Sequence, residues 1–273
     1  MDTSKENRIS IMFETLRSKG ECALIPYLTA GFPKPEATSA LLEALVAGGA
    51  DLIELGVPFS DPIADGPTIQ AACKVALDQG TTVRKVLEIL RDFRSRHTTP
   101  VVLFGAYNPF FRYGLKQFAK DARAAGADGV LIPDLPVEAA DEVAPILKDE
   151  GLHLILLVAP TTPPERKAAI ASRAQGFLYY ISVKGVTGAR KDGLPDLREP
   201  IRELRKVTEL PIAVGFGISS PEQAASVAQI GDGVIVGSAL IELIRQNADQ
   251  PDLCDRVKEF VSALKAAVQS ARK

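Results

Sequence analysis

Histidine and cysteine are both scarce in this chain of 273 residues. Its two histidines, His97 and His153, exclude a metal centre built from several histidines and leave few candidates for a Ser-His-Asp triad. The three cysteines, at positions 22, 73 and 254, lie far apart with no paired spacing. This pattern gives no indication of a disulfide framework or a zinc site, and it is typical of a protein in a reducing compartment.

The chain also lacks a charge of one sign and a long hydrophobic run. Its 32 Lys and Arg residues nearly balance 34 Asp and Glu residues, so there is no basic field for binding nucleic acid. The longest apolar stretch, residues 154–160, is far shorter than the ~20 residues that cross a bilayer. The polar N-terminus, residues 1–8, does not resemble a signal peptide. We therefore expect a soluble, cytoplasmic protein that binds neither nucleic acid nor membranes.

The chain instead shows a regular alternation of short apolar runs and amphipathic stretches. Near-continuous runs of Ile, Val and Leu indicate strands of a parallel sheet that helices cover. Eight candidate strands lie at residues 22–30, 51–56, 100–106, 128–133, 153–159, 177–183, 211–216 and 232–236. The segments between them carry apolar residues at helical spacing, as in residues 83–93.

Eight such βα units in about 250 residues predict a (β/α)8 barrel. We expect one domain over residues 1–273, with an extra N-terminal helix at 5–19 and a short helix after strand eight. Ser220, followed by Pro221 and Gln223, marks a helix start. An open doubly wound sheet is the competing fold, but it usually has fewer strands and a G-x-G-x-x-G turn after the first strand, which this chain lacks.

Two acidic residues fall in and after the second predicted strand. Glu54 lies between Ile53 and Leu55, and alternation along the strand places it in the barrel interior. A carboxyl there is costly unless it is paired or functional, and burial raises its pKa toward neutral pH. It is either a structural group bonded to a neighbouring strand or an acid–base catalyst. Asp65, in the loop that leaves this strand, is either a turn former or a second, ionised carboxylate.

Glycine-rich segments follow the last three strands. Gly217 follows strand seven, and Gly237 with Ser238 follows strand eight, where barrels commonly bind phosphate through backbone N–H groups and a helix N-terminus. Residues 185–188, which begin and end with glycine, form a third such segment after strand six. Glycine turns often serve only geometry, but three of them at adjacent strand ends favour a phosphate site.

A lysine and a pair of tyrosines near strand six each allow a functional and a structural interpretation. Lys184 stands where the Schiff-base lysine of an aldolase could lie, although a solvated loop lysine is the interpretation that we favour. One of Tyr179 and Tyr180 must face inward, because successive side chains of a strand alternate. A phenol at that depth can orient a substrate.

The segment LIELGVPFSDP at residues 52–62, with Asp-Gly-Pro at 65–67, resembles the signature of the tryptophan synthase alpha chain family. Residues 185–188, 215–218 and 237–239 match the family in order and interval, so the resemblance covers nearly the whole chain. It implies a lyase of tryptophan biosynthesis that cleaves indole-3-glycerol phosphate to indole and glyceraldehyde 3-phosphate. The implied chemistry is a retro-aldol cleavage by carboxylate acid–base catalysis.

The resemblance also implies roles for single residues. Glu54 matches the general acid–base, Asp65 the carboxylate that contacts the indole N–H, and Tyr179 the tyrosine beside the catalytic carboxylate. The other matches are Gly188, Gly217, Gly237 and Ser238 for the phosphate, Tyr27, Leu131 and Leu157 for the indole pocket, and Asp61 and Thr187 in the closing loops. No metal is implied.

The family's partner is a beta chain that carries pyridoxal phosphate and receives the indole, commonly in an α2β2 assembly. This chain therefore needs no cofactor of its own. Ala106 departs from the family pattern, in which a tyrosine is common beside the substrate, and Val183 stands where Arg or Leu is common. We expect activity to survive with a changed substrate affinity. The alternatives are a free-standing lyase that releases indole, an aldolase that uses Lys184, and a phosphate-binding module with a decayed site, against which Glu54 and Asp65 argue.

Overall fold

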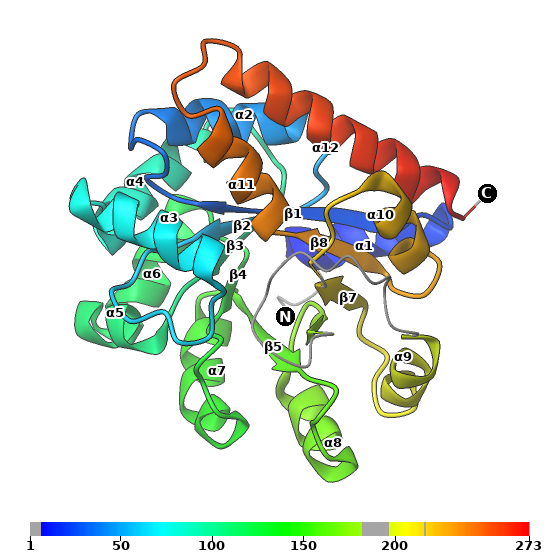
Figure 1. The fold of residues 1–273 in the computed structure, drawn as a ribbon. Helices are drawn as coiled ribbons and strands as arrows, with labels where there is room; N and C mark the ends of the chain where they lie inside the picture. Colours follow the sequence, from blue (N-terminus) through cyan, green and yellow to red (C-terminus); the bar gives the residue numbers. More distant parts are fainter. Residues whose placement is uncertain (1–6, 182–196, 216, 273) are drawn as a thin grey trace.

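The computed structural model describes residues 7–181, 197–215 and 217–272 (Figure 1). Its eight parallel strands close into a barrel in sequence order, and β1 pairs with both β2 and β8. The strands are β1 (Ala23–Thr29), β2 (Ile53–Gly56), β3 (Val101–Phe104), β4 (Gly129–Leu131), β5 (His153–Val158), β6 (Leu178–Ile181), β7 (Ile212–Gly215) and β8 (Gly233–Val236). The predicted (β/α)8 barrel is confirmed, and each strand lies within its predicted range.

Helices surround the barrel on its outer face (Figure 1). They are α1 (Arg8–Ser18), α2 (Ala37–Ala47), α3 (Pro67–Asp78), α4 (Val83–Arg94), α5 (Tyr107–Tyr113), α6 (Leu115–Ala125), the 3-10 helix η2 (Val137–Ala139), α7 (Ala140–Asp149), α8 (Pro164–Arg173), α9 (Arg198–Arg205), α10 (Pro221–Ala228), α11 (Ser238–Gln246) and α12 (Leu253–Ser270). The predicted helix start at Ser220 is confirmed, because the Ser220 side chain caps α10 by accepting a hydrogen bond from the backbone N–H of Gln223. No helix in the described ranges combines the length and the hydropathy needed to cross a membrane.

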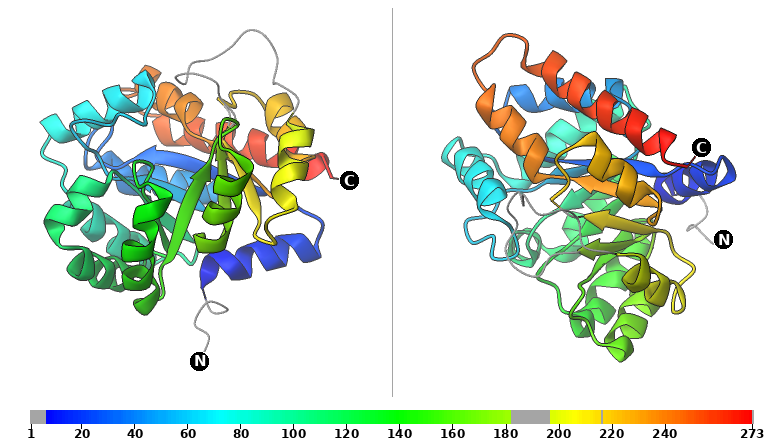
Figure 2. Two further views of the ribbon diagram at one scale, coloured as in Figure 1. Left: turned by 90° about the horizontal axis from the view of Figure 1, so that it is seen from below. Right: turned by 45° about the vertical axis from the view of Figure 1, so that its right-hand side comes forward.

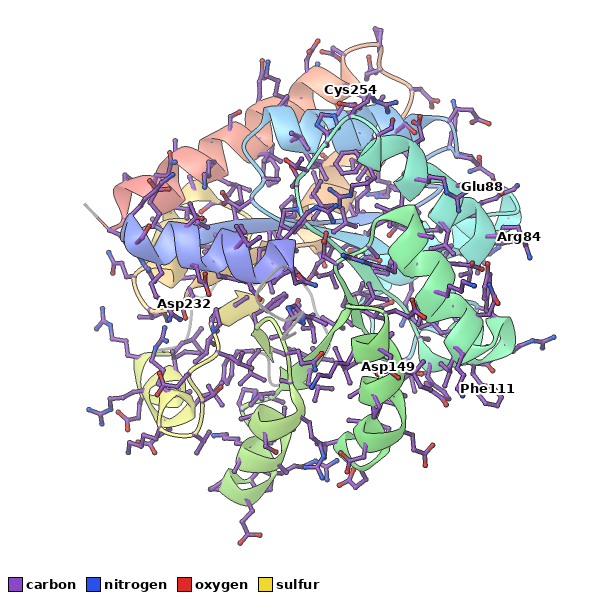
Figure 3. All side chains as sticks on the ribbon, turned by 180° about the vertical axis from the view of Figure 1, so that it is seen from behind. Arg84, Glu88, Phe111, Asp149, Asp232 and Cys254 are labelled. Carbon is purple, nitrogen blue, oxygen red and sulfur yellow. The ribbon has the colours of Figure 1, made fainter. Side chains whose placement is uncertain are left out.

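Helix α1 closes the N-terminal end of the barrel. Its residues Ile9, Phe13 and Leu16 are buried in one cluster with inward-facing strand residues such as Val102 and Ile155. The left view of Figure 2 shows this helix below the strands, and Figure 3, seen from behind, shows it crossing them. The extra helix predicted before the first strand is therefore present, and its apolar face fills one end of the barrel. The space for a ligand therefore lies at the opposite end of the barrel, at the C-terminal ends of the strands.

Asp128, the residue before β4, links α1 to the barrel through hydrogen bonds. Its carboxylate is fully buried and accepts hydrogen bonds from Arg8 Nη1 at 2.7 Å, Arg94 Nη2 at 3.1 Å and the backbone N–H of Val101 at 2.9 Å. The side-chain amide of Asn7 donates to the carbonyl oxygen of Asp128 at 2.8 Å. A buried carboxylate is tolerated when donors surround it in this way.

Candidate active site

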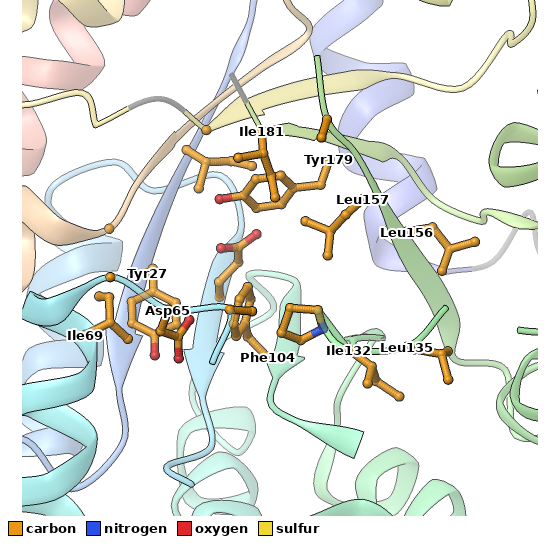
Figure 4. A pocket seen from close by; sticks show the side chains of 18 of the residues that line it. Tyr27, Asp65, Ile69, Phe104, Ile132, Leu135, Leu156, Leu157, Tyr179 and Ile181 are labelled. Carbon is orange, nitrogen blue, oxygen red and sulfur yellow. The ribbon is translucent and has the colours of Figure 1, made fainter. Parts of the chain in front are cut away.

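The C-terminal ends of the strands surround a cavity of about 380 Å³ (Figure 4). Much of its wall is apolar, with Phe104, Ile132, Leu135, Leu156 and Leu157 among the lining residues. A concave, mainly apolar site with a few polar groups is typical of pockets for small organic ligands. The polar side chains that line it include those that the sequence singled out for catalysis.

Glu54 projects from β2 into this cavity. It lies level with Tyr27 of β1 and Val102 of β3, and only 1% of its surface is exposed. Within the part of the chain that the structure describes, its Oε1 atom has no hydrogen-bond partner. Burial without a compensating donor raises the pKa of Glu54 to about 8, so this carboxyl keeps its proton at neutral pH. The inward orientation predicted from alternation is confirmed.

Asp65 lines the same cavity from the loop between β2 and α3. Two hydrogen bonds shape this loop: the Asp65 N–H donates to the Pro62 carbonyl at 3.0 Å, and Gln70 Nε2 donates to the Asp65 carbonyl at 2.9 Å. Burial, and then the charge of Asp134, raise the pKa of the Asp65 carboxyl to about 6. At neutral pH Asp65 is therefore mostly ionised while Glu54 is protonated.

Tyrosines on two strands line the cavity beside these carboxyls, and glycines make room for both. Tyr27 belongs to β1 and Tyr179 to β6 (Figure 4). A Cβ atom on Gly56 would lie 2.2 Å from the Tyr27 hydroxyl, and one on Gly215 would lie 2.4 Å from the Tyr179 hydroxyl. Burial raises the pKa of both phenols well above the usual range, so both stay neutral. Tyr180 instead packs in the outer apolar layer, as alternation requires.

Gly217, Gly237 and Ser238 lie together along the cavity wall. Gly217 has a φ of +49°, in the left-handed region that favours glycine. Ser238 is the first residue of α11. The N-terminal N–H groups of this helix, which have no partner within the helix, therefore start at the cavity wall. The predicted short helix after strand eight is thus present. Further predicted positions lie outside the described residues: Lys184, Thr187 and Gly188.

Leu131 is not among the residues that line this cavity, although the resemblance assigns it to the indole pocket. It is fully buried in the cluster that fills the barrel interior, together with Val102 and Ile155. The residues that line the cavity here are Ile132 and Pro133, which follow the end of β4. Tyr27 and Leu157, the other two indole-pocket positions, do line it.

Other lining residues carry no motif that would identify them in the sequence. Phe104 packs edge-on against Tyr27, with ring centroids 5.4 Å apart. Arg166 of α8 lines the cavity and forms an ion pair with Glu138, through N–O distances of 2.7 and 3.0 Å. The signal for Phe104 is its place at the C-terminal end of a strand. Arg166 lies on a helix, where nothing in the sequence connects it to the cavity.

The remaining residues of interest lie away from the main cavity. Asp61 is exposed, accepts a hydrogen bond from Ser60 Oγ at 2.9 Å and lines a smaller neighbouring cavity. His153 begins β5 at the far end of the barrel, with its Nε2 atom 3.1 Å from Ser10 Oγ. The three cysteines are free. Within the described ranges, no group of three or more His, Cys, Asp or Glu side chains is placed to hold a metal ion.

Proteins of one family resemble this chain over nearly its whole length. A family model described as the tryptophan synthase alpha chain matches residues 13–269. The tryptophan synthase alpha chain of Marinobacter nauticus is 46% identical over 266 residues, 97% of this chain and 98% of the relative. That of a Picosynechococcus species is 49% identical over 261 residues, 95% of this chain and 98% of the relative. The crystal structure of tryptophan synthase subunit alpha from Legionella pneumophila is 42% identical and has a TM-score of 0.91, covering 97% of this chain and 99% of that one.

Proposed function

Since the chain belongs to the tryptophan synthase alpha chain family, the lyases that cleave indole-3-glycerol phosphate to indole and glyceraldehyde 3-phosphate, we propose that Glu54 and Asp65 perform this cleavage. The observation that carries the proposal is the pair of carboxyls in one largely apolar cavity, with pKa values of about 8 and about 6. Two carboxyls whose surroundings separate their pKa values can act as proton donor and charge stabiliser at the same pH.

The reaction breaks the bond between indole C3 and the first carbon of the side chain. Protonated Glu54 donates its proton to C3, which leaves a positive charge shared with the ring nitrogen. Ionised Asp65 accepts a hydrogen bond from the ring N–H and stabilises that charge. The Glu54 carboxylate then takes the proton of the side-chain hydroxyl. As the aldehyde forms, the electron pair of the broken bond returns to the ring, indole leaves, and Glu54 is protonated again.

The rest of the cavity positions the substrate in this proposal. The phosphate lies against the backbone of Gly217, Gly237 and Ser238, with Gly188 added by the family resemblance. Tyr27 and Leu157 enclose the indole ring. The neutral Tyr179 hydroxyl orients the Glu54 carboxyl. We assign residues 1–273 to one catalytic domain, an assignment supported by the pairing of β1 with both β2 and β8.

A tryptophan synthase beta chain is the partner of the alpha chains of this family. We propose an α2β2 assembly in which the beta chain holds pyridoxal phosphate and receives the indole, so this chain binds no cofactor itself. Asp61 and Thr187 would close their loops over the occupied site. A cytoplasmic location is supported by the three free cysteines.

The test is to follow indole release from indole-3-glycerol phosphate by the purified chain, alone and with a tryptophan synthase beta chain. We expect slow release by the chain alone and a strong rise when the beta chain is added. Fast release that the beta chain does not change would instead identify a free-standing lyase. No release under either condition would overturn the proposal.

A further inference from the structure

A second, smaller cavity adjoins the main one at Asp65. It has a volume of about 20 Å³ and shares the lining residues Tyr27, Asp65 and Phe104 with the main cavity, where Figure 4 shows them close together. Gly105 and Ala106, which follow β3, line the smaller cavity but not the main one. A cavity needs roughly 10–15 Å³ to hold one water molecule, so this side chamber has room for one group the size of water or a methyl.

The size of residue 106 determines the depth of the side chamber. The neighbouring wall cannot accept a side chain, because a Cβ atom on Gly105 would lie 2.7 Å from Phe110 Cζ and 3.1 Å from Val57 Cβ. The backbone at Gly105 is thus already packed against the core behind it. Ala106 is half-buried and contributes only a methyl group to the chamber. A larger side chain at position 106 would occupy the space.

The lining of the side chamber selects for a small neutral group. Tyr27, Phe104 and Ala106 give it aromatic and aliphatic surface. The carboxyl-bearing residues Asp61 and Asp134 also line it, in addition to the Asp65 that it shares with the main cavity. An anionic group would be repelled by these carboxylates and would lose its hydration, whereas a methyl group would bury apolar surface.

We propose that Ala106 determines specificity, because the side chamber that it leaves open admits a methyl-sized, neutral substituent on the six-membered ring of the substrate. This inference rests on the proposed function, in which the ring N–H contacts Asp65. Since Asp65 lines both cavities, the ring position nearest the chamber is C7, the carbon on the nitrogen side of the six-membered ring. One buried methyl group favours binding by about fourfold, which corresponds to ~0.8 kcal/mol.

The experiment compares indole-3-glycerol phosphate with its 7-methyl and 5-methyl analogues. The 5-methyl group lies away from the nitrogen edge and serves as the substrate control. The value of kcat/KM is measured for all three compounds with the parent enzyme, with Ala106→Leu, which fills the chamber, and with Ala106→Ser, which hardly changes its size. Circular dichroism establishes that each variant is folded, and Ala106→Val replaces Ala106→Leu if the leucine variant does not fold.

With the parent enzyme we expect the 7-methyl analogue to react within about fivefold of the unsubstituted substrate, since overpacking would cost about fivefold or more. In Ala106→Leu the ratio of 7-methyl to unsubstituted kcat/KM should fall by at least about tenfold, while the 5-methyl ratio stays constant. Ala106→Ser should retain both ratios. The inference is overturned if filling the chamber leaves the 7-methyl ratio unchanged, or if the parent enzyme rejects the 7-methyl analogue while it cleaves the unsubstituted substrate. Failure to cleave the unsubstituted substrate would overturn the proposed function instead.

Discussion

At the scale of single residues, the cavity gives two carboxyls different pKa values, because their surroundings differ. Glu54 is buried and its Oε1 atom has no hydrogen-bond donor within the described ranges, so its neutral form is favoured. Asp65 is less enclosed, and its pKa is raised less, by burial and by the charge of Asp134. The ionised Asp65 and the protonated Glu54 therefore coexist in one pH interval.

The pH dependence of kcat/KM should follow from these two groups, since this parameter reports the pKa values of the free enzyme. Activity should rise as the pH passes about 6, where Asp65 loses its proton and becomes the charge stabiliser. It should fall as the pH passes about 8, where Glu54 loses the proton that it donates to the substrate. A profile that keeps rising through pH 8 would show that Glu54 does not start the reaction as an acid.

The variant Asp134→Asn should move the acidic limb of this profile to lower pH. Removing the Asp134 charge relieves the repulsion that raises the pKa of Asp65, so Asp65 ionises at a lower pH. The asparagine can still accept the hydrogen bond that the Tyr107 N–H donates to Asp134 Oδ1 at 2.9 Å, so the loop geometry is retained. The alkaline limb should not move. Asp149→Asn, a change of the same kind at the exposed end of α7, is the control and should leave both limbs in place.

Replacing Glu54 by glutamine should lower kcat by about 10²–10⁴-fold, the usual contribution of a general acid–base. Glutamine preserves the shape of the side chain but cannot donate a proton to carbon. Substrate binding, measured by calorimetry with the inactive variant, should be largely retained, because the proposed phosphate contacts follow other strands, β7 and β8. If Glu54→Gln keeps most of its activity, another group must supply the proton.

At the scale of the elements, the N-terminal helix depends on one buried carboxylate. Helix α1 fills the barrel end with apolar side chains, but its position is also held by the ion pair of Arg8 with Asp128, at 2.7 Å. The same carboxylate pairs with Arg94 of α4 at 3.1 Å, so it links two helices to the strand that follows it. Removing one member of a buried ionic network leaves the other charges without compensation.

The variant Asp128→Ala should therefore lower the free energy of unfolding by about 3 kcal/mol. Urea denaturation followed by circular dichroism measures this difference. Asp92→Ala is the matched control, because Asp92 is an exposed aspartate on α4 whose ion pair with Arg96 lies at the surface. It should cost less than about 1 kcal/mol. Equal effects of the two variants would show that the network at Asp128 contributes little.

At the scale of the whole molecule, the two ends of the barrel differ. The N-terminal end is filled by α1, whereas the C-terminal end holds the cavity. Large exposed apolar side chains occur at both ends: Ile63 and Phe111 at the C-terminal end, and Ile11 and Val207 at the N-terminal end. Phe111 of α5 is 59% exposed, lies at the rim of the molecule in Figure 3 and stacks on Tyr107 with ring centroids 5.6 Å apart. Exposed apolar surface near a site is a common feature of partner interfaces.

The variant Phe111→Ser should weaken binding of the beta chain by at least about fivefold, which corresponds to ~1 kcal/mol lost at an interface position. Isothermal titration calorimetry measures this affinity. Val207→Ser is the control, because Val207 is also an exposed apolar residue, at 42%, but it precedes β7 at the N-terminal end of the barrel. A loss of affinity in Val207→Ser, with none in Phe111→Ser, would place the interface on the other end.

Much of the architecture could be read from local patterns. Apolar runs of strand length predicted all eight strands, and period-two alternation placed Glu54 in the interior and left one of two adjacent tyrosines facing inward. These inferences succeed because side-chain direction in a strand depends only on neighbouring residues. The glycines after strands seven and eight were predicted by their place at strand ends, and Gly217 and Gly237 line the cavity.

The sequence by itself thus determined the order of the elements, the barrel fold and which two carboxyl residues, Glu54 and Asp65, are proposed for catalysis. Only the tertiary structure decided which residues meet across strands. It placed Leu131 in the packed interior rather than in the cavity wall, and it brought Arg166 to that wall and Asp134 close enough to raise the pKa of Asp65. Such proximity depends on which strands lie side by side and on the path of loops far apart in the chain, and the alternation within one strand specifies neither.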